Sequence, residues 1–145
     1  MDEFDTELLA LLRENARTPV ADLARKLGAA RTTVQARIER LERNGVIAGY
    51  TLRLGDAATP ALRATALIAI EPRSAPAVLD RLRSLPAIDI VHTTSGRWDL
   101  MVQISTDTTA ALDDTIDRIG EIRGVRSSES LIHLSTKIDR SGSAS

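Results

Sequence analysis

The 145-residue sequence has no cysteine, only 2% aromatic residues and no long apolar run. Without cysteine, a disulfide framework, a thiolate metal site and a cysteine nucleophile are all excluded. With so few aromatic side chains, any core must be built from Leu, Ile, Val and Ala. No stretch approaches the roughly 18 apolar residues of a membrane span, and the acidic start MDEFDTELL lacks the basic region and apolar run of a signal peptide. These features predict a soluble, cytoplasmic protein with no membrane partner.

The formal net charge is only −1, but the positive charge is unevenly distributed. Residues 23–53 contain seven basic and two acidic side chains, so the rest of the chain is net acidic. Such a segment favours a polyanionic partner, although a basic helical face that is merely solvated is the commoner case. The length allows one small module and one larger one.

The first 54 residues have the apolar periodicity of helices. A first helix is predicted from Asp2 to Asn15, capped by an aspartate of its first turn. A second, short helix is predicted after Thr18-Pro19, with threonine as the N-cap and proline as the first helical residue, and it ends at Gly28. A third helix ends at Gly45. Three helices with a tight, glycine-containing turn between the last two match the helix-turn-helix pattern.

Beyond this point the periodicity changes, and residues 46–54 are typical of an extended connecting strand. The following elements are predicted in the order strand, helix, strand, strand, helix, strand, at 63–71, 75–85, 87–95, 98–105, 108–122 and 125–138. This β-α-β-β-α-β order is the ferredoxin-like split βαβ arrangement. We therefore predict an α+β chain: an N-terminal winged-type helix-turn-helix domain with a connecting strand at 1–54, a linker at 55–62, a C-terminal ferredoxin-like βαββαβ domain at 63–138 and a disordered tail at 139–145.

An antiparallel four-stranded sheet with both helices on one face leaves its other face uncovered. That face is predicted to carry apolar residues such as Leu67, Val91 and Met101, or their strand alternates. One chain cannot cover such a surface, so we expect self-association through the sheet.

Two sequence motifs resemble those of one known family. RIERLERNGVIAGYT at the junction of the two modules, followed by SGRWDL between the second and third sheet strands, resembles the Lrp/AsnC family, the feast/famine transcriptional regulators of bacteria and archaea. The resemblance covers about residues 2–138. It implies a transcriptional regulator rather than an enzyme, with double-stranded DNA as its partner and no cofactor. It also implies a dimer that assembles into a tetramer or octamer, and an amino-acid effector that changes assembly or DNA affinity.

The resemblance makes the third predicted helix the recognition helix, whose N-terminal residues enter the major groove. Arginine and glutamine can bind guanine and adenine edges, and threonine can contact a base or a phosphate. The arginines farther along suit phosphate contacts or salt bridges with neighbouring glutamates, and for Arg37 packing or ion pairing is as well supported as DNA contact. The family commonly has Leu-Ser before this helix, whereas this chain has Ala29-Ala30 and so lacks the serine cap. The predicted DNA-binding residues are Arg31, Thr32, Thr33, Gln35, Arg37, Arg40 and Arg43.

The loop from Ser95 to Asp99 is the second predicted site, because the resemblance implies that the C-terminal domain binds free amino acids near it, in a pocket shared between subunits. Glycine permits a close backbone approach, exposed N–H groups can receive a carboxylate, and Asp99 can accept hydrogen bonds from an ammonium group. A purely structural turn is the alternative for this loop, as is ordinary strand packing for two serines of the last strand. The predicted effector-binding residues are Ser95, Gly96, Arg97, Trp98, Asp99, Ser128 and Ser130.

The sequence has no Gly-rich phosphate loop, nucleophile elbow or paired-carboxylate motif, and the spacing of His92 and His133 does not favour a metal site. Neither catalytic residues nor metal ligands are therefore predicted. Two alternatives stay open at this point: an enzyme built on a dimeric α+β barrel, and a stand-alone amino-acid sensor that acts through protein partners. Neither requires arginines on the exposed face of a helix-turn-helix, so residues 31–43 distinguish them from a DNA-binding regulator.

Overall fold

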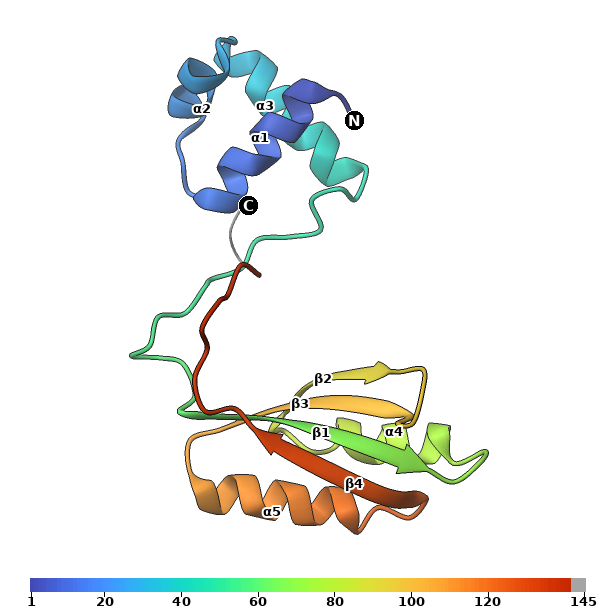
Figure 1. Ribbon diagram of the computed structural model, residues 1–145. Coiled ribbons are helices and arrows are strands. Elements are labelled where there is room, and N and C mark those ends of the chain that lie inside the picture. Colours follow the sequence, from blue (N-terminus) through green and yellow to red (C-terminus); the bar gives the residue numbers. More distant parts are fainter. Residues whose placement is uncertain (142–145) are drawn as a thin grey trace. The chain divides into compact units, whose positions relative to one another are not determined.

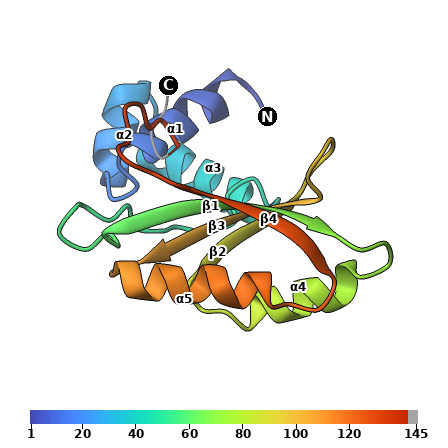
Figure 2. The same cartoon turned by 60° about the horizontal axis from the view of Figure 1, so that its bottom comes forward.

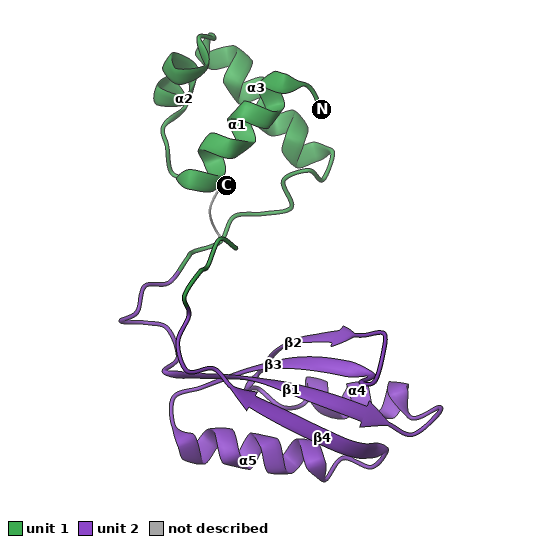
Figure 3. Ribbon diagram, in the orientation of Figure 1, with its two compact units in different colours: residues 1–53, 137–145 green, residues 54–136 purple. Residues whose placement is uncertain are grey.

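The computed structural model describes residues 1–141 and divides into two compact units (Figure 3). Unit 1 contains residues 1–53 together with the end of the chain from Lys137. Unit 2 contains residues 54–136. Unit 1 is entirely helical in its regular structure, whereas unit 2 combines a sheet with helices (Figure 1).

Unit 1 consists of α1 (Glu3–Glu14), α2 (Val20–Leu27) and α3 (Arg31–Arg43). Helix α1 is capped at its start as predicted, because Asp2 Oδ1 accepts a hydrogen bond from the Asp5 N–H at 2.9 Å. The three helices bury a small aliphatic core made of Leu8, Leu12, Leu23, Ala24, Val34 and Leu41. The predicted helix-turn-helix is thus confirmed.

Two local predictions for unit 1 are wrong. Pro19 is the N-cap residue of α2 and precedes the helix, instead of occupying its first turn. The reason is that Thr18 turns back, its hydroxyl donating to the Asn15 carbonyl at 2.7 Å, and so does not cap α2. Residues 46–54, predicted as an extended connecting strand, form no strand, and within the described chain unit 1 has no β-structure that could serve as a wing.

Unit 2 contains β1 (Leu62–Ile70), α4 (Ala75–Arg83), β2 (Ile88–Thr93), β3 (Leu100–Thr106), α5 (Thr109–Gly120) and β4 (Val125–Ile132). The sheet order is β2-β3-β1-β4 and all neighbouring strands are antiparallel, which confirms the βαββαβ arrangement. Figure 2 shows α4 and α5 together on one side of the sheet. Alternate residues of β1 and β3 are buried beneath them: Ala64, Ala66, Ile68, Leu100, Val102 and Ile104.

The side of the sheet without helices is here called the open sheet face. Two rows of side chains on it run across all four strands in the cross-strand register. The rows are His92, Met101, Leu67 and Glu129, then Ile90, Gln103, Thr65 and Leu131. Two of the three apolar residues predicted for this face are therefore on it.

Val91 is the exception, and its predicted position is wrong. It pairs with the buried Val102 and packs against the core beneath the helices. The cause is an irregularity in the register between Ile88 and Ile90, which shifts the alternation of β2 relative to β3.

The last strand is shorter than predicted, ending at Ile132 instead of residue 138. Its partner β1 begins at Leu62, and the final ladder contact is the His133 N–H donating to the Arg63 carbonyl. Beyond that point there is no neighbouring strand to pair with. In the predicted disordered tail, Ser141 donates to the Asp139 carboxylate; residues 142–145 lie outside the described residues.

Candidate nucleic-acid interface and effector loop

The turn between α2 and α3 sets where the candidate recognition helix starts. Gly28 has φ +62°, a left-handed conformation that ends α2, and the Ala29 N–H then donates to the Ala24 carbonyl. Ala30 is the N-cap residue of α3 and makes no side-chain capping hydrogen bond, which confirms the predicted loss of the serine cap. The orphan N–H groups at this helix start are available to solvent or to an anion.

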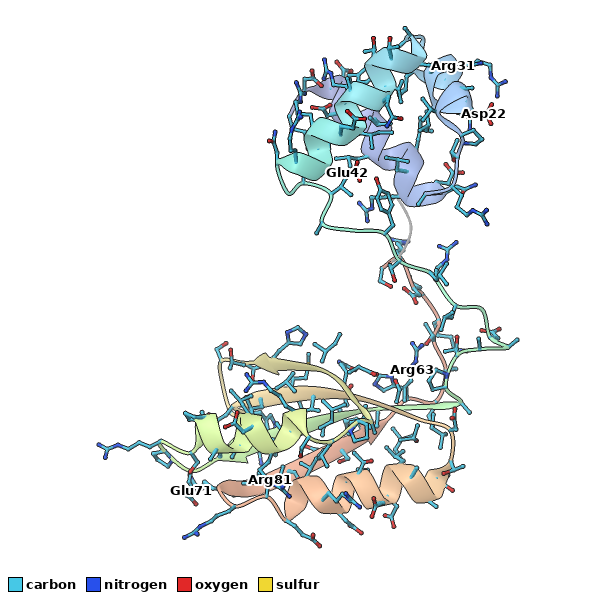
Figure 4. The ribbon with its side chains drawn as sticks, turned by 180° about the vertical axis from the view of Figure 1, so that it is seen from behind. Asp22, Arg31, Glu42, Arg63, Glu71 and Arg81 are labelled. Atoms are coloured by element: carbon cyan, nitrogen blue, oxygen red, sulfur yellow. The ribbon has the colours of Figure 1, made fainter. Side chains whose placement is uncertain are left out.

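The outer face of α3 near its start is polar and exposed. Val34 and Leu41 anchor the inner face in the core of unit 1. Figure 4 labels Arg31 at the beginning of the helix. The exposed polar residues at its start are the four predicted to meet base edges, Arg31, Thr32, Thr33 and Gln35. Only the last has a side-chain hydrogen bond within the described chain, through which its Nε2 donates to Glu39 Oε1 at 3.1 Å.

Arg37 and Arg40, one turn farther along, are engaged with α1. Arg37 Nη1 donates to Asp2 Oδ2 at 2.6 Å and to Asp5 Oδ1 at 3.1 Å. Arg40 Nη2 donates to Asp5 Oδ2 at 2.8 Å. The Arg37 guanidinium also lies 5.1 Å from the centre of the Phe4 ring, within the range of a cation–π contact. These four charged residues, Asp2, Asp5, Arg37 and Arg40, are here called the α1–α3 ion cluster.

Asp5 is the centre of the cluster, because its side chain is 0% exposed. Burial alone would raise the pKa of the Asp5 carboxyl, but hydrogen bonds from Arg37 and Arg40 overcome that effect and lower the pKa. The pKa of Asp2 is lowered by the hydrogen bond from the Asp5 N–H and by Arg37. Hydrogen bonds to the two aspartates raise the pKa of Arg37. The shifts in pKa therefore hold Asp2, Asp5 and Arg37 in their charged forms.

Sequence reasoning missed Asp5 as the partner of these arginines and considered only Glu39 and Glu42. A usable signal was present: aspartates three residues apart on one predicted helix, and arginines three residues apart on another. Residues at this spacing share a helix face, so each pair can meet the other across a helix contact. Within residues 1–141, Arg31 and Arg43 form no ion pair, so the positive charge of α3 that is left for a ligand is at its two ends.

The predicted effector loop connects β2 to β3 and is tied to the end of β1. Gly96 has φ +96°, which favours glycine, and the Thr94 hydroxyl donates to the Trp98 carbonyl at 2.6 Å. The Asp99 carboxylate accepts a hydrogen bond from the Ile70 N–H at 2.8 Å. One oxygen of Asp99 thus has a structural partner, as the turn interpretation expects. The Arg97 guanidinium lies 5.4 Å from the Trp98 ring centre.

The two predicted serines of β4 lie at different distances from this loop along the strand. Ser128 is opposite Ile68, whose carbonyl accepts from the Asp99 N–H, so this serine is at the same end of the sheet as the loop. Ser130 is opposite Ala66, one step farther from the loop. Both pair with residues buried beneath the helices, and therefore belong to the helix-covered side of the sheet instead of the open sheet face.

A helix-turn-helix with an exposed, basic helix, followed by a βαββαβ unit, defines a two-module DNA-binding regulator. The sequence-family model for the AsnC-type helix-turn-helix domain matches residues 1–42 of this chain. The family model for the Lrp/AsnC ligand binding domain matches residues 63–142. The chain is 30% identical to the HTH-type transcriptional regulator LysM of Saccharolobus solfataricus over 137 residues, covering 94% of this chain and 95% of the relative. The chain therefore belongs to the Lrp/AsnC family of transcriptional regulators, as its motifs predict.

Solved structures agree with this assignment. AsnC of E. coli has a TM-score of 0.88 and 26% identity, covering 97% of this chain and 96% of that structure. The transcriptional regulator NMB0573 of Neisseria meningitidis, solved as a complex with L-Met, has a TM-score of 0.90 over 98% of this chain and 95% of its own. At 19% identity the second likeness shows the shared fold alone. The curated relative is a transcriptional regulator, so the enzyme alternative has no support among these proteins. Within residues 1–141, no helix has the length and apolar character needed to cross a membrane.

Proposed function

We propose that the protein binds a specific DNA sequence by inserting the first two turns of α3 into the major groove. The observation that carries this proposal is the division of α3 into a free and an engaged half. The exposed side chains of the first half, Arg31, Thr32, Thr33 and Gln35, have the donors and acceptors that read base edges.

The arginines of the second half have a different role in this proposal. Arg37 and Arg40 fix the helix on α1, and only secondarily face phosphates, since Asp2 and Asp5 already neutralise much of their charge. Arg43, which is exposed in the last turn, is the better candidate for a phosphate contact.

Self-association follows from the open sheet face. Ile90 and Leu131 are each 49% exposed on it, and Leu67 and Met101 lie in the neighbouring row, on the two central strands. A second copy is the simplest cover for this apolar surface, giving a dimer that can assemble further into a tetramer or octamer. A two-fold dimer predicts a palindromic operator with half-sites about one helical turn apart, or a multiple of it.

An amino acid is the proposed effector, bound near the loop that contains Gly96 and Asp99, with Ser95, Arg97, Trp98, Ser128 and Ser130 in its surroundings. Support comes from the match to a ligand-binding domain and from the L-Met complex of the Neisseria regulator. An effector changes DNA affinity only as far as it binds one assembly better than another.

The DNA proposal is tested by fluorescence anisotropy with a duplex from upstream of the protein's own gene and a scrambled duplex, at two salt concentrations. Specific binding that weakens with salt is expected. The double variant Arg31→Ala, Gln35→Ala should lose the preference between duplexes while keeping its oligomeric mass. No salt-sensitive binding to either duplex would contradict the proposal and favour a sensor that acts through protein partners.

The effector proposal needs a pair of variants, because Asp99 also holds the Ile70 N–H. Asp99→Asn keeps an oxygen for that hydrogen bond but removes the negative charge that an ammonium group would meet. We expect it to weaken the binding of L-methionine or another free amino acid in calorimetry with little change in thermal stability. Asp99→Ala should lower both the affinity for the amino acid and the thermal stability. Unchanged affinity in both variants would exclude this loop as the ammonium site.

A further inference from the structure

The α1–α3 ion cluster is electrically neutral as a unit, although it contains two arginines of the basic helix. Arg37 and Arg40 carry two positive charges, and Asp2 and Asp5 carry two negative ones. Three ion pairs of 2.6, 3.1 and 2.8 Å join the four side chains, so the opposite charges are in direct contact. The cluster therefore attracts an anion much less than two unpaired arginines would.

The cluster borders the surface that is proposed to enter the major groove. Thr33 precedes Arg37 by four residues, and Arg40 follows Arg37 by three, so the three side chains share one stripe of α3. Phosphates flank the groove that a recognition helix occupies, and arginine is a common ligand for them. The positions of Arg37 and Arg40 thus suit phosphate contact, whereas their aspartate partners oppose it.

The two arginines are held to different degrees. The Arg37 side chain is 27% exposed and contacts two carboxylates and the face of the Phe4 ring. The Arg40 side chain is 44% exposed and donates to one carboxylate, that of Asp5, through Nη2. Because a guanidinium has several N–H donors, Arg40 can reach a phosphate without leaving Asp5. The negative charge of that carboxylate then offsets much of the attraction.

Asp2 limits the charge of the cluster at its exposed edge. Its side chain is 53% exposed, whereas that of Asp5 is 0% exposed. Since Asp2 lies 2.6 Å from Arg37 Nη1, any phosphate bound by that guanidinium would be well within the ~8–10 Å over which charges act at physiological salt. The Asp2 carboxylate would therefore repel this phosphate.

We propose that Asp2 and Asp5 limit the sequence-independent part of DNA binding, by holding Arg37 and Arg40 in a neutral cluster beside the recognition surface. This inference rests on the proposed insertion of α3 into the major groove, and it gives two residues of α1 a role in setting DNA affinity. Sequence preference stays with the free first half of α3, because phosphate contacts are available on every duplex.

The measurement is the salt dependence of binding to the specific and scrambled duplexes by the full-length chain. The first probe is Asp2→Asn, because asparagine caps a helix as well as aspartate does, while the cluster gains one net positive charge. Each added phosphate contact steepens the slope of log K against log salt by about 0.9. For each recognition helix on the duplex, we expect this steepening and binding about three- to tenfold tighter at roughly 0.1 M salt. The preference between the duplexes should not change.

Glu3→Gln is the matched control. It removes one negative charge from the residue next to Asp2, but within residues 1–141 Glu3 forms no ion pair. The slope should therefore stay close to that of the unchanged protein. When Asp2→Asn is combined with Arg37→Gln, the added slope should disappear, because the released guanidinium is absent.

Asp5→Asn is the second probe and should steepen the slope by releasing Arg40. It is measured at a temperature at which circular dichroism shows that the helices of this variant are folded. Equal steepening in Asp2→Asn and Glu3→Gln, or none in Asp2→Asn and Asp5→Asn, would overturn the proposal. Weaker binding of both duplexes by the two folded variants would also overturn it, because the cluster would then act only by holding α3 in place. An absence of salt-sensitive binding by the unchanged protein would instead overturn the proposed DNA function itself.

Discussion

The two units of this protein are stabilised by different means. Unit 2 buries twelve hydrophobic residues, and its two buried polar residues, Thr106 and Thr115, donate their hydroxyls to backbone carbonyls. Unit 1 buries six hydrophobic residues and one charged one, Asp5. A small module has little apolar surface to bury, so the contact between α1 and α3 depends on an ion cluster as well as on packing. The comparison teaches that one helix, α3, both holds its unit together through its second half and carries, in its first half, the surface proposed to meet DNA.

The surfaces that the units leave uncovered differ accordingly. Unit 1 exposes the polar, cationic start of α3, which suits a hydrated polyanion. Unit 2 exposes an apolar sheet face, which suits another protein surface. Substitutions can change the stability of each unit separately. Trp98, the only tryptophan, reports on unit 2 by its fluorescence.

The largest expected effect is on the aliphatic core of unit 2. Ile68 is 0% exposed, and Ile68→Ala should lower the free energy of unfolding by about 2–5 kcal/mol because a cavity is left in a close-packed core. Urea unfolding followed by Trp98 fluorescence measures this change. Ile68→Val is the matched control and should cost only about 0.5–1.5 kcal/mol. Equal costs for the two variants would show that this site can collapse around the missing atoms.

Breaking the ion cluster should affect unit 1 alone. Asp5→Asn leaves two arginines facing a neutral amide, and we expect the thermal midpoint of the helical signal in circular dichroism to fall by roughly 10 °C. The Trp98 transition should keep its midpoint. Asp80→Asn is the control, since Asp80 pairs with Arg83 at the surface, where both side chains are 75% exposed, and should change little. A similar loss in both variants would contradict the special role of the buried carboxylate.

Within unit 2, one glycine is predicted to be needed for full stability. Gly124 has φ +105°, and an added Cβ would lie 2.7 Å from Ser74 Cβ. Gly124→Ala should therefore destabilise unit 2 by about 1–3 kcal/mol in urea unfolding. Gly120, at the end of α5, has open space around it, and Gly120→Ala should be neutral or stabilise by up to about 1 kcal/mol. If Gly124→Ala unfolds like the unchanged protein, the close approach to Ser74 is relaxed in solution.

The smallest expected effect is a difference in acid sensitivity between the units. The pKa values of Asp2 and Asp5 are lowered below the ordinary 3.8, so their contribution to stability is fully present above that pH and is lost as the pH falls through the lowered values. We expect the helical signal of unit 1 to weaken below about pH 4 before Trp98 fluorescence changes. In Asp5→Asn the difference in pH between these two transitions should become smaller. An unchanged difference would contradict the assignment of the acid sensitivity of unit 1 to its ion cluster.

Much of this architecture could be predicted from the sequence. Apolar periodicity located the helices of unit 1 and the order of elements in unit 2, because both signals depend on neighbours along the chain. Val91 was placed on the wrong face because a register irregularity depends on the partner strand. The strand after residue 132 was predicted because its alternation continues, although β1 offers no partner there. The ion cluster was missed although the three-residue spacing of the aspartates and of the arginines was visible, because that spacing does not show that the two helix faces meet; Asp5 and Arg40 are 35 residues apart.

The most direct test of the DNA-binding assignment is to locate DNA relative to α3. Ala36 is exposed on this helix, and Ala36→Cys in the cysteine-free chain can carry an iron chelate that cleaves nearby DNA. With the protein bound to its specific duplex, we expect cleavage confined to two positions about one helical turn apart, or a multiple of it, one in each half-site. Cleavage from a label on Asp113→Cys of α5, with none from residue 36, would contradict the assignment of α3 as the recognition helix.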